Sequence, residues 1–491
     1  MNRTTLSLFA GTAALAAVTA FAAVDSPSAS GAAPEAAARQ PVERTSLVCP
    51  APSTSDLAET TYTSFTPVTK GAASGGRARL QAAGEKDAKA GKDKKAGQPV
   101  LTPKAPGTPA ASDTSGGDTP ALVGTADGSF APGWTVQETT EVAAGTGRGL
   151  LGVNCAGADT DFWFPGASTA AGRTDYVHLT NPDDSAAVAD IELYGKDGPI
   201  KAPLGENLTI EPGASEAFLL PTLTEERQTD LTVHVSVRGG RVGAAVQALD
   251  DKAGGDWLAP ATDPAGSLVL PGIPKDATDV RLTVFAPGDD DADLKIRLAS
   301  PDGLITPAGN ETVHVKSGMT TTVGLGDVTR GEPGSLVLTP TDQAVPVVAA
   351  LQVVRGKGDK RETAFIPATA AVGARATSAG NTAKGTTLAL TAPEGAAAVK
   401  VTASAGSEGG TPATRTYTIK SGTTQDVDAP VPAGLKGTYA LTVEPVSGGP
   451  VYASRTLSTA GTPAFTVQTL PSDHGLVSVP RTREDLSILQ K

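Results

Sequence analysis

The chain has 491 residues, a length that corresponds to several domains of ordinary size. Aromatic residues make up 4% and charged residues 19%, whereas glycine (56) and proline (38) are abundant. This composition suits many short strands joined by turns better than long helices. The formal net charge of −12 argues against binding to nucleic acid or to an anionic membrane, because both require a basic face.

The first residues have the layout of a secretory signal peptide. Arg3 supplies a short positive region, Leu6 to Val18 form an apolar run, and small residues around Ala20 precede a polar break at Asp25. We therefore predict a signal peptide over residues 1–24 and a secreted or cell-envelope location. The alternative is an uncleaved anchor, which would make the membrane a partner. The Ala/Pro/Ser-rich residues 25–44 are predicted to be disordered.

The two cysteines, Cys49 and Cys155, are predicted to form one disulfide, the usual state of a cysteine pair in an exported protein. Closing a loop of 106 residues would stabilise the fold by about 4–5 kcal/mol in the chain-entropy model. The alternative is a redox or metal-binding pair, but the C-x-x-C spacing and neighbouring histidines of such sites are missing.

Residues 45–165 are predicted to form a divergent β domain with a disordered insertion at 70–120, where lysine, aspartate, threonine and proline replace any apolar pattern. The insertion would lie inside the loop closed by the disulfide. Its threonines are open to O-glycosylation in an alternative reading.

From residue 166 the sequence repeats with a period of about 105 residues. Three segments each contain an alternating strand that stops at proline, a second alternating strand, and a strand that enters a glycine turn at Gly213, Gly318 and Gly422. Each segment then has two strands expected to form a hairpin, and a final strand that runs into proline. The pattern predicts three immunoglobulin-like β-sandwiches at 166–262, 263–369 and 370–472, followed by a tail at 473–491. Only the sandwich architecture is predicted, since the cysteine and tryptophan spacing of antibody domains is absent.

Known catalytic and metal-binding patterns find no good match in the sequence. His178, His234 and His314 lie in alternating strands and are expected to point outward, and Asp473-His474 is expected to be solvated in the tail. The stretch Gly147–Gly152 has the spacing of a dinucleotide fingerprint but opens no helix. The acidic run Asp289–Asp293 lacks the glycine and the glutamate of a calcium loop. We therefore expect no catalytic residue, no metal and no cofactor.

The cluster Phe162-Trp163-Phe164 is the candidate ligand site. Three adjacent aromatics on a strand must point to both of its faces. One face is expected to enter a core, and the other either packs on a neighbouring domain or forms an exposed platform for sugar rings. Packing is the preferred reading, and Trp134 and Trp257 are likewise expected in cores or at domain junctions.

The chain resembles a family of exported actinobacterial proteins of unknown function. The resemblance rests on the signal peptide, the Cys49 and Cys155 pair, the segment Phe162–Gly166 and the strand that ends at Leu179–Pro182, and it spans roughly residues 45–471. It implies an exported protein and assigns no catalytic residues.

The sequence leaves three functions open for this protein. The first is a non-catalytic envelope or secreted protein whose sandwich array is a spacer or interaction surface, with envelope polysaccharide or another envelope protein as partner. The second is a carbohydrate-binding protein that uses the region of Trp163. The third is a hydrolase, which would need clustered carboxylates or a Ser/His pair in a cleft. Exposure of Trp163 separates the second from the first.

Overall fold

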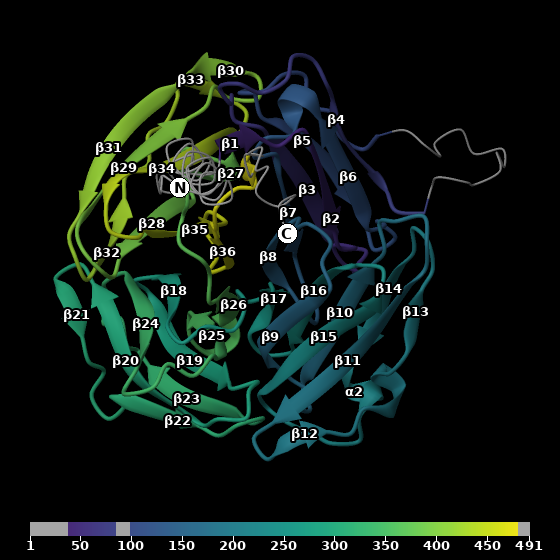
Figure 1. The fold of residues 1–491 in the computed structure, drawn as a ribbon, viewed down its shortest axis with the longest axis vertical. Coiled ribbons are helices and arrows are strands. Elements are labelled where there is room, and N and C mark those ends of the chain that lie inside the picture. Colours follow the sequence, from purple (N-terminus) through teal and green to yellow (C-terminus); the bar gives the residue numbers. More distant parts are fainter. Residues whose placement is uncertain (1–37, 85–98, 480–491) are drawn as a thin grey trace, which may run out of the picture. The chain divides into compact units, whose positions relative to one another are not determined.

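The computed structural model describes residues 38–84 and 99–479, and almost all of its regular structure is β-strand (Figure 1). The predicted signal peptide at 1–24 lies outside the described residues. The residues Pro41–Val477 form one compact unit, and the few described residues on either side of it belong to a second. Near the two ends of the described chain, β1 (Ala38–Pro41) pairs with β37 (Leu476–Val479). β1 lies in the segment 25–44 that was predicted to be disordered, and β37 lies in the predicted tail at 473–491.

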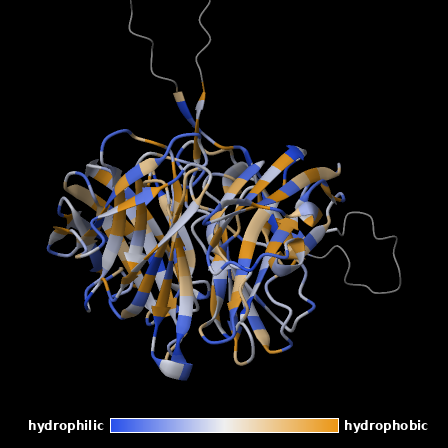
Figure 2. Ribbon diagram, turned by 90° about the horizontal axis from the view of Figure 1, so that it is seen from below, coloured by the Kyte–Doolittle hydropathy of each residue, from blue (hydrophilic) through white to orange (hydrophobic). Residues whose placement is uncertain are grey.

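The strands of Pro41–Val477 form four successive sandwiches. In each sandwich, side chains alternate between a buried and an outward face, which is visible as alternating colours along the strands in Figure 2. The buried side chains of two facing sheets form one hydrophobic core per sandwich. The all-β prediction is therefore confirmed.

The first sandwich contains a three-stranded sheet in the order β2-β6-β4 and a four-stranded sheet in the order β5-β3-β7-β8. Its elements are β2 (Arg44–Cys49), β3 (Ala58–Phe65), β4 (Ala78–Ala82), β5 (Ala110–Ser115), β6 (Leu122–Asp127), η1 (Gly128–Phe130), β7 (Thr135–Val142) and β8 (Gly149–Asn154). The predicted disordered insertion at 70–120 is wrong for its described part, because β4 and β5 both lie within it. Residues 85–98 of that insertion lie outside the described residues.

The second sandwich has the sheets β12-β11-β15-β9 and β14-β10-β16-β17, with β13 added beside β11. Its elements are β9 (Asp161–Ala167), β10 (Arg173–Thr180), β11 (Ala187–Gly195), β12 (Gly198–Ile200), η2 (Pro203–Gly205), β13 (Leu208–Ile210), β14 (Ser215–Leu219), α2 (Leu220–Leu223), β15 (Leu231–Gly239), β16 (Gly243–Asp250) and β17 (Gly254–Leu258). Because β9 pairs with β15, the aromatic strand opens this sandwich. The predicted boundary at 165/166, which placed that strand at the end of the first domain, is therefore corrected.

The third sandwich has the sheets β18-β24-β20-β21 and β23-β19-β25-β26, with β22 beside β20. Its elements are β18 (Leu268–Ile273), β19 (Ala277–Phe285), β20 (Ala292–Ser300), β21 (Gly303–Ile305), β22 (Thr312–Val315), β23 (Thr320–Gly326), β24 (Gly334–Pro340), β25 (Val348–Arg355), η3 (Gly358–Lys360) and β26 (Glu362–Pro367).

The fourth sandwich has the sheets β27-β34-β29-β31 and β32-β28-β35-β36, and a small sheet of β30 with β33. Its elements are β27 (Ala376–Asn381), β28 (Thr386–Ala392), β29 (Ala397–Ala403), β30 (Gly409–Thr411), β31 (Ala413–Ile419), β32 (Thr423–Val427), β33 (Ala433–Lys436), β34 (Tyr439–Gly448), β35 (Tyr452–Ser458) and β36 (Phe465–Thr469).

The glycines that defined the repeat occupy the same turn in three sandwiches. Gly213, Gly318 and Gly422 all have φ values near +70° (71°, 67° and 73°), a conformation that favours glycine. These glycines precede β14, β23 and β32, respectively. Each of these three strands lies at the edge of its sheet, next to the first strand of the sequence repeat (β10, β19 and β28). The structural repeat therefore matches the sequence period.

The predicted closing hairpins are wrong. In each of the last three sandwiches the two strands concerned, for example β15 and β16, belong to opposite sheets. The last two strands of each sandwich do pair in one sheet, for example β16 with β17, as the last two strands of an immunoglobulin domain do. Before them, in the second sandwich, the long strands β9, β10, β11, β14, β15 and β16 alternate between the two sheets. The structure therefore agrees with several β-sandwich domains, and the immunoglobulin-like type of these sandwiches stays a prediction.

The four sandwiches contact one another in a closed cycle. The last strand of each sandwich contacts that of the next, in the order β8, β17, β26 and β36, and β36 also contacts β8. The cores extend across these contacts, since Phe465 and Val467 of β36 join the core of the third sandwich, and Phe365 of β26 joins that of the second. In every sandwich, the sheet that contains this last strand has it at an edge.

Candidate functional site

The predicted aromatic cluster is buried. Phe162 and Phe164 of β9 enter the core of the second sandwich, with ring centroids 6.4 Å apart. Trp163 points to the opposite face and is only 9% exposed, because it packs against Phe285 and Val348 of the third sandwich. The reading of Trp163 as an exposed sugar platform is therefore wrong, and the reading as packing between domains agrees with the structure. Trp257 similarly fills the junction between the first two sandwiches, and Trp134 fills the first core.

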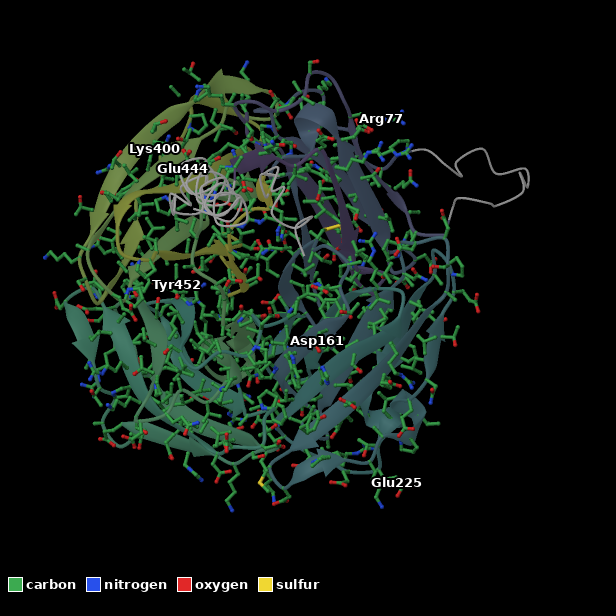
Figure 3. All side chains as sticks on the ribbon, viewed as in Figure 1. Arg77, Asp161, Glu225, Lys400, Glu444 and Tyr452 are labelled. Carbon is green, nitrogen blue, oxygen red and sulfur yellow. A yellow bond between two sulfur atoms is a disulfide. The ribbon has the colours of Figure 1, made fainter. Side chains whose placement is uncertain are left out.

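His234 links Trp163 to two carboxylates on the outer face of the same sheet. Its ring stacks on the indole of Trp163, with centroids 3.8 Å apart. The Nδ1 atom lies 2.7 Å from Glu192 Oε2, and Nε2 lies 3.0 Å from Asp161 Oδ2. Asp161 is marked in Figure 3. Across 38–84 and 99–479, no group of three or more His, Cys, Asp or Glu side chains is arranged to hold a metal ion.

A groove of about 330 Å³ lies beside this histidine, lined by β11, β12, residues 201–202 and 206–207, and Arg238 of β15. The Asp190 carboxylate accepts hydrogen bonds from Arg238 Nε (2.7 Å) and from the backbone N–H of Asn207 (2.7 Å). Arg238 also donates to Asn207 Oδ1 at 2.7 Å. These three side chains therefore hold one another in a fixed arrangement at the groove.

The loop before Asn207 is pressed against β11. A Cβ atom on Gly205 would lie 2.5 Å from the carbonyl oxygen of Ile191, so this position requires glycine. Asn207 itself has φ of +56°, the left-handed region that asparagine tolerates better than most residues. The loop is thus shaped by its backbone, and it places Asn207 next to Asp190.

Tyr194 gives the groove an aromatic side. Its ring packs against Phe285 with centroids 4.6 Å apart, and its hydroxyl donates to Glu192 Oε2 at 3.1 Å. Burial and the neighbouring Glu192 raise the pKa of Tyr194 to about 12, so the hydroxyl is neutral and remains a donor at physiological pH.

A second polar centre lies where the four sandwiches meet. The fully buried Asp256 of β17 accepts hydrogen bonds at Oδ1 from the N–H of Gly152 in β8 (2.9 Å) and from Thr466 Oγ1 in β36 (3.1 Å). The N–H of Trp257 also donates to this oxygen, at 2.8 Å. Burial raises the pKa of Asp256 well above its usual range, and these donors, together with the N–H of Phe365 in β26, oppose the rise. One carboxyl group therefore interacts with all four terminal strands.

Two more charged groups make structural contacts, one inside a sandwich and one between two sandwiches. Arg455 is fully buried in the fourth sandwich; it donates to Gln468 Oε1 (2.7 Å) and to the carbonyl of Ala379, and burial lowers its pKa to about 9. Arg148 pairs with Glu362 at 3.5 Å and donates to the carbonyl of Arg361 at 3.0 Å, which joins the first sandwich to the third.

The remaining predicted residues are distributed over the molecule. Cys49 and Cys155 form the predicted disulfide, which indicates an oxidising environment. His178, expected to point outward, is buried, and its pKa is lowered to about 4 by burial. His314 is exposed and lies 2.9 Å from Asp293. Asp473, expected to be solvated, is only partly exposed and pairs with Arg375, whereas His474 is exposed.

The glycine-rich stretch 147–152 runs into the strand β8, which has none of the helical geometry of a dinucleotide site. No pattern in the sequence pointed to the groove, since Asp190, Tyr194 and Arg238 are ordinary outward-facing positions of alternating strands. For Asp256 there was a weak signal, because it is an acidic residue within an otherwise apolar terminal strand.

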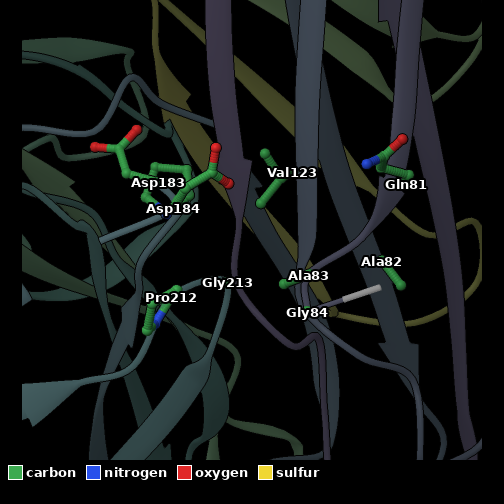
Figure 4. A pocket seen from close by; sticks show the side chains of 10 residues that line it. Gln81, Ala82, Ala83, Gly84, Val123, Asp183, Asp184, Pro212 and Gly213 are labelled. Carbon is green, nitrogen blue, oxygen red and sulfur yellow. The ribbon is translucent and has the colours of Figure 1, made fainter. Parts of the chain in front are cut away.

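A separate cavity of about 170 Å³ lies between the first and second sandwiches (Figure 4). Asp183 and Asp184 line one side and Gln81 the other, and Asp183 pairs with Arg241 at 2.8 Å. This cavity is small and is bordered by the turns at residues 83–84, 182–184 and 212–213.

The family model described as a family of unknown function, DUF5719, matches residues 110–430. The chain belongs to the DUF5719 family. The match runs from the start of β5 in the first sandwich to the loop after β32 in the fourth, so the DUF5719 region contains the groove and Asp256. It is narrower than the span expected from the resemblance. No curated protein matches the chain. In the described part of this DUF5719 protein, no helix is long and apolar enough to span a membrane.

Proposed function

We propose that this protein is a non-catalytic secreted or cell-envelope protein whose four sandwiches form a rigid interaction array. The observation that carries this proposal is the contact of Asp256 with all four terminal strands. It fixes the sandwiches to one another, so their outer sheet faces are presented in constant relative positions. A flexible spacer would not need a shared buried carboxyl group.

The two acidic residues whose pKa values are raised most strongly support a structural role for the protein rather than a catalytic one. Asp256 lies at the junction of the sandwiches and Glu138 lies in the core of the first sandwich, and both are fully buried. In an enzyme, such perturbed groups are expected in a cleft that reaches substrate. The disulfide supports export, because such bonds persist in oxidising compartments.

The test has two parts. Fractionation of the producing cells is expected to place the protein in the medium or the envelope, and the purified protein is expected to show no turnover of ester, glycoside and peptide substrates above buffer. A cytoplasmic location, or a turnover that one point substitution removes, would overturn the proposal.

Carbohydrate binding remains a second candidate function. It no longer rests on Trp163, whose ring is covered by Phe285 and Val348. The observation that favours it is the groove on the outer face of β11 and β15, where an aromatic ring and fixed polar groups adjoin.

A further inference from the structure

We infer that the groove lined by Asp190, Glu192, Tyr194, Asn207 and Arg238 binds a neutral saccharide unit. The inference rests on the proposed function, since it assigns a ligand class to one outer face of the array. It concerns a single sheet, formed by β12, β11, β15 and β9 (Figure 1).

The first argument is preorganisation. The Asp190 side chain is only 16% exposed and is held by both Arg238 and the Asn207 backbone. Arg238 in turn orients the amide of Asn207 by donating to its oxygen. A ligand therefore meets side chains whose positions are already set, which lowers the entropy cost of binding.

The second argument is the hydrogen-bonding capacity that remains. Within the described residues, Asn207 Nδ2 donates to no other atom, and Glu192 Oε1 accepts from none, because the partners of these two residues use the other terminal atoms. Lys201 and Glu206 add an exposed cation and an exposed anion to the rim. The groove thus offers both donors and acceptors, and sugar hydroxyl groups both donate and accept.

The third argument is charge. The groove holds the carboxylates of Asp190, Glu192 and Glu206 against the cations of Lys201 and Arg238. Asp190 is neutralised by Arg238, and Glu192 is bonded to His234. Neither an anionic nor a cationic ligand finds a strong excess of opposite charge, so a neutral polar ligand fits best.

The fourth argument is shape. A volume of about 330 Å³ is at the lower end for small-molecule sites, so the groove suits one or two sugar rings. Tyr194 lines it and is held from behind by Phe285, which provides an aromatic surface for the apolar face of a sugar ring.

The experiment is binding of the full, disulfide-intact protein to an array of immobilised neutral and acidic oligosaccharides, followed by calorimetric titration with the best neutral glycan. The test variants are Arg238→Gln and Asn207→Gly. Glycine tolerates the left-handed backbone at 207, so the second variant removes the amide while leaving the Arg238–Asp190 pair intact. Arg241→Gln is the matched control, because Arg241 is also exposed and also pairs with an aspartate, outside the groove.

The expected result is binding to neutral glycans that Asn207→Gly and Arg238→Gln each weaken by about tenfold or more, with Arg241→Gln unchanged. If Arg238→Gln fails to fold, Asn207→Gly decides the outcome alone. The inference is overturned if no neutral glycan binds, if binding is confined to acidic glycans, or if Arg241→Gln weakens it equally. If no neutral glycan binds while the protein is extracellular and shows no turnover, the saccharide site is rejected and the proposed interaction array still stands.

Discussion

Asp256 is the residue on which the contact of the four sandwiches most depends. Replacing it with alanine leaves the N–H groups of Gly152 and Trp257 without their acceptor in a buried place. Each buried donor left unpaired costs about 1–3 kcal/mol, so Asp256→Ala should lower the free energy of unfolding by about 3–5 kcal/mol. Urea denaturation followed by circular dichroism measures this.

Asp256→Asn should be milder than Asp256→Ala, with a loss of about 1–2 kcal/mol, because an uncharged acceptor suits a site where burial disfavours the carboxylate. Asp263→Ala, in an exposed linker position, is the control and should have no measurable effect. Equal stability of Asp256→Ala and the unmodified protein would show that the carboxyl group does not hold the strands together.

Glu362 gives the stability a pH dependence of its own. Burial raises its pKa from 4.5 to about 7 in the folded protein, although Arg148 opposes the rise. The folded state therefore binds this proton more tightly than the unfolded state. The stabilisation is present at acid pH and is lost as the pH rises from about 4.5 to 7.

The glutamine of the Glu362→Gln variant cannot ionise, so this variant should not lose stability in this way as the pH rises. Its free energy of unfolding relative to the unmodified protein should therefore increase steadily between pH 4.5 and 7, as measured by urea unfolding at several pH values. A constant difference over that range would mean that Glu362 keeps its ordinary pKa.

Among the elements, repeated strands were predictable and their pairing was not. Three strands per repeat follow from alternation and from the turns at Gly213, Gly318 and Gly422, which need a left-handed residue whatever the tertiary structure. The sheet to which a strand belongs could not be predicted from the same patterns. A strand that crosses the sandwich, such as β16 after β15, has the same alternation and the same glycine turn as a strand that forms a hairpin.

The candidate site was less predictable than the fold. Trp163 was identified from its neighbours, but its burial depends on Phe285, more than 100 residues away. Asp190, Asn207 and Arg238 come together only because β11 pairs with β15 and the loop at 203–205 folds back on β11. No local pattern encodes that meeting of distant segments.

The disulfide joins the end of β2 to the residue that follows β8, and both cysteines belong to the core of the first sandwich. Complete reduction should destabilise this sandwich by about 4–5 kcal/mol in the chain-entropy model, because a 106-residue loop is released. Denaturation with and without reductant measures the effect. The variant with both cysteines changed to alanine should not respond to reductant, and an unshifted midpoint after full reduction of the unmodified protein would contradict the prediction.

For the molecule as a whole, the closed cycle of contacts predicts cooperative unfolding. The linkers between sandwiches are themselves hydrogen-bonded, since Ala265 pairs with Val347 and Thr369 pairs with Val269. Pro41–Val477 should therefore unfold in one calorimetric transition, and proteases should spare these two linkers. Fragments of about 100 residues released from the unmodified protein would instead indicate independent domains.

The cycle of contacts also brings the two ends of Pro41–Val477 together. The backbone N–H of Val42 donates to the carbonyl of Gly475 at 3.1 Å, and β8 of the first sandwich contacts β36 of the last. The order in which the four sandwiches are connected along the chain is therefore not dictated by their packing. A circularly permuted chain, opened between the second and third sandwiches and joined across Val42 and Gly475, should reach the same fold, as a gene fusion of this kind would in evolution.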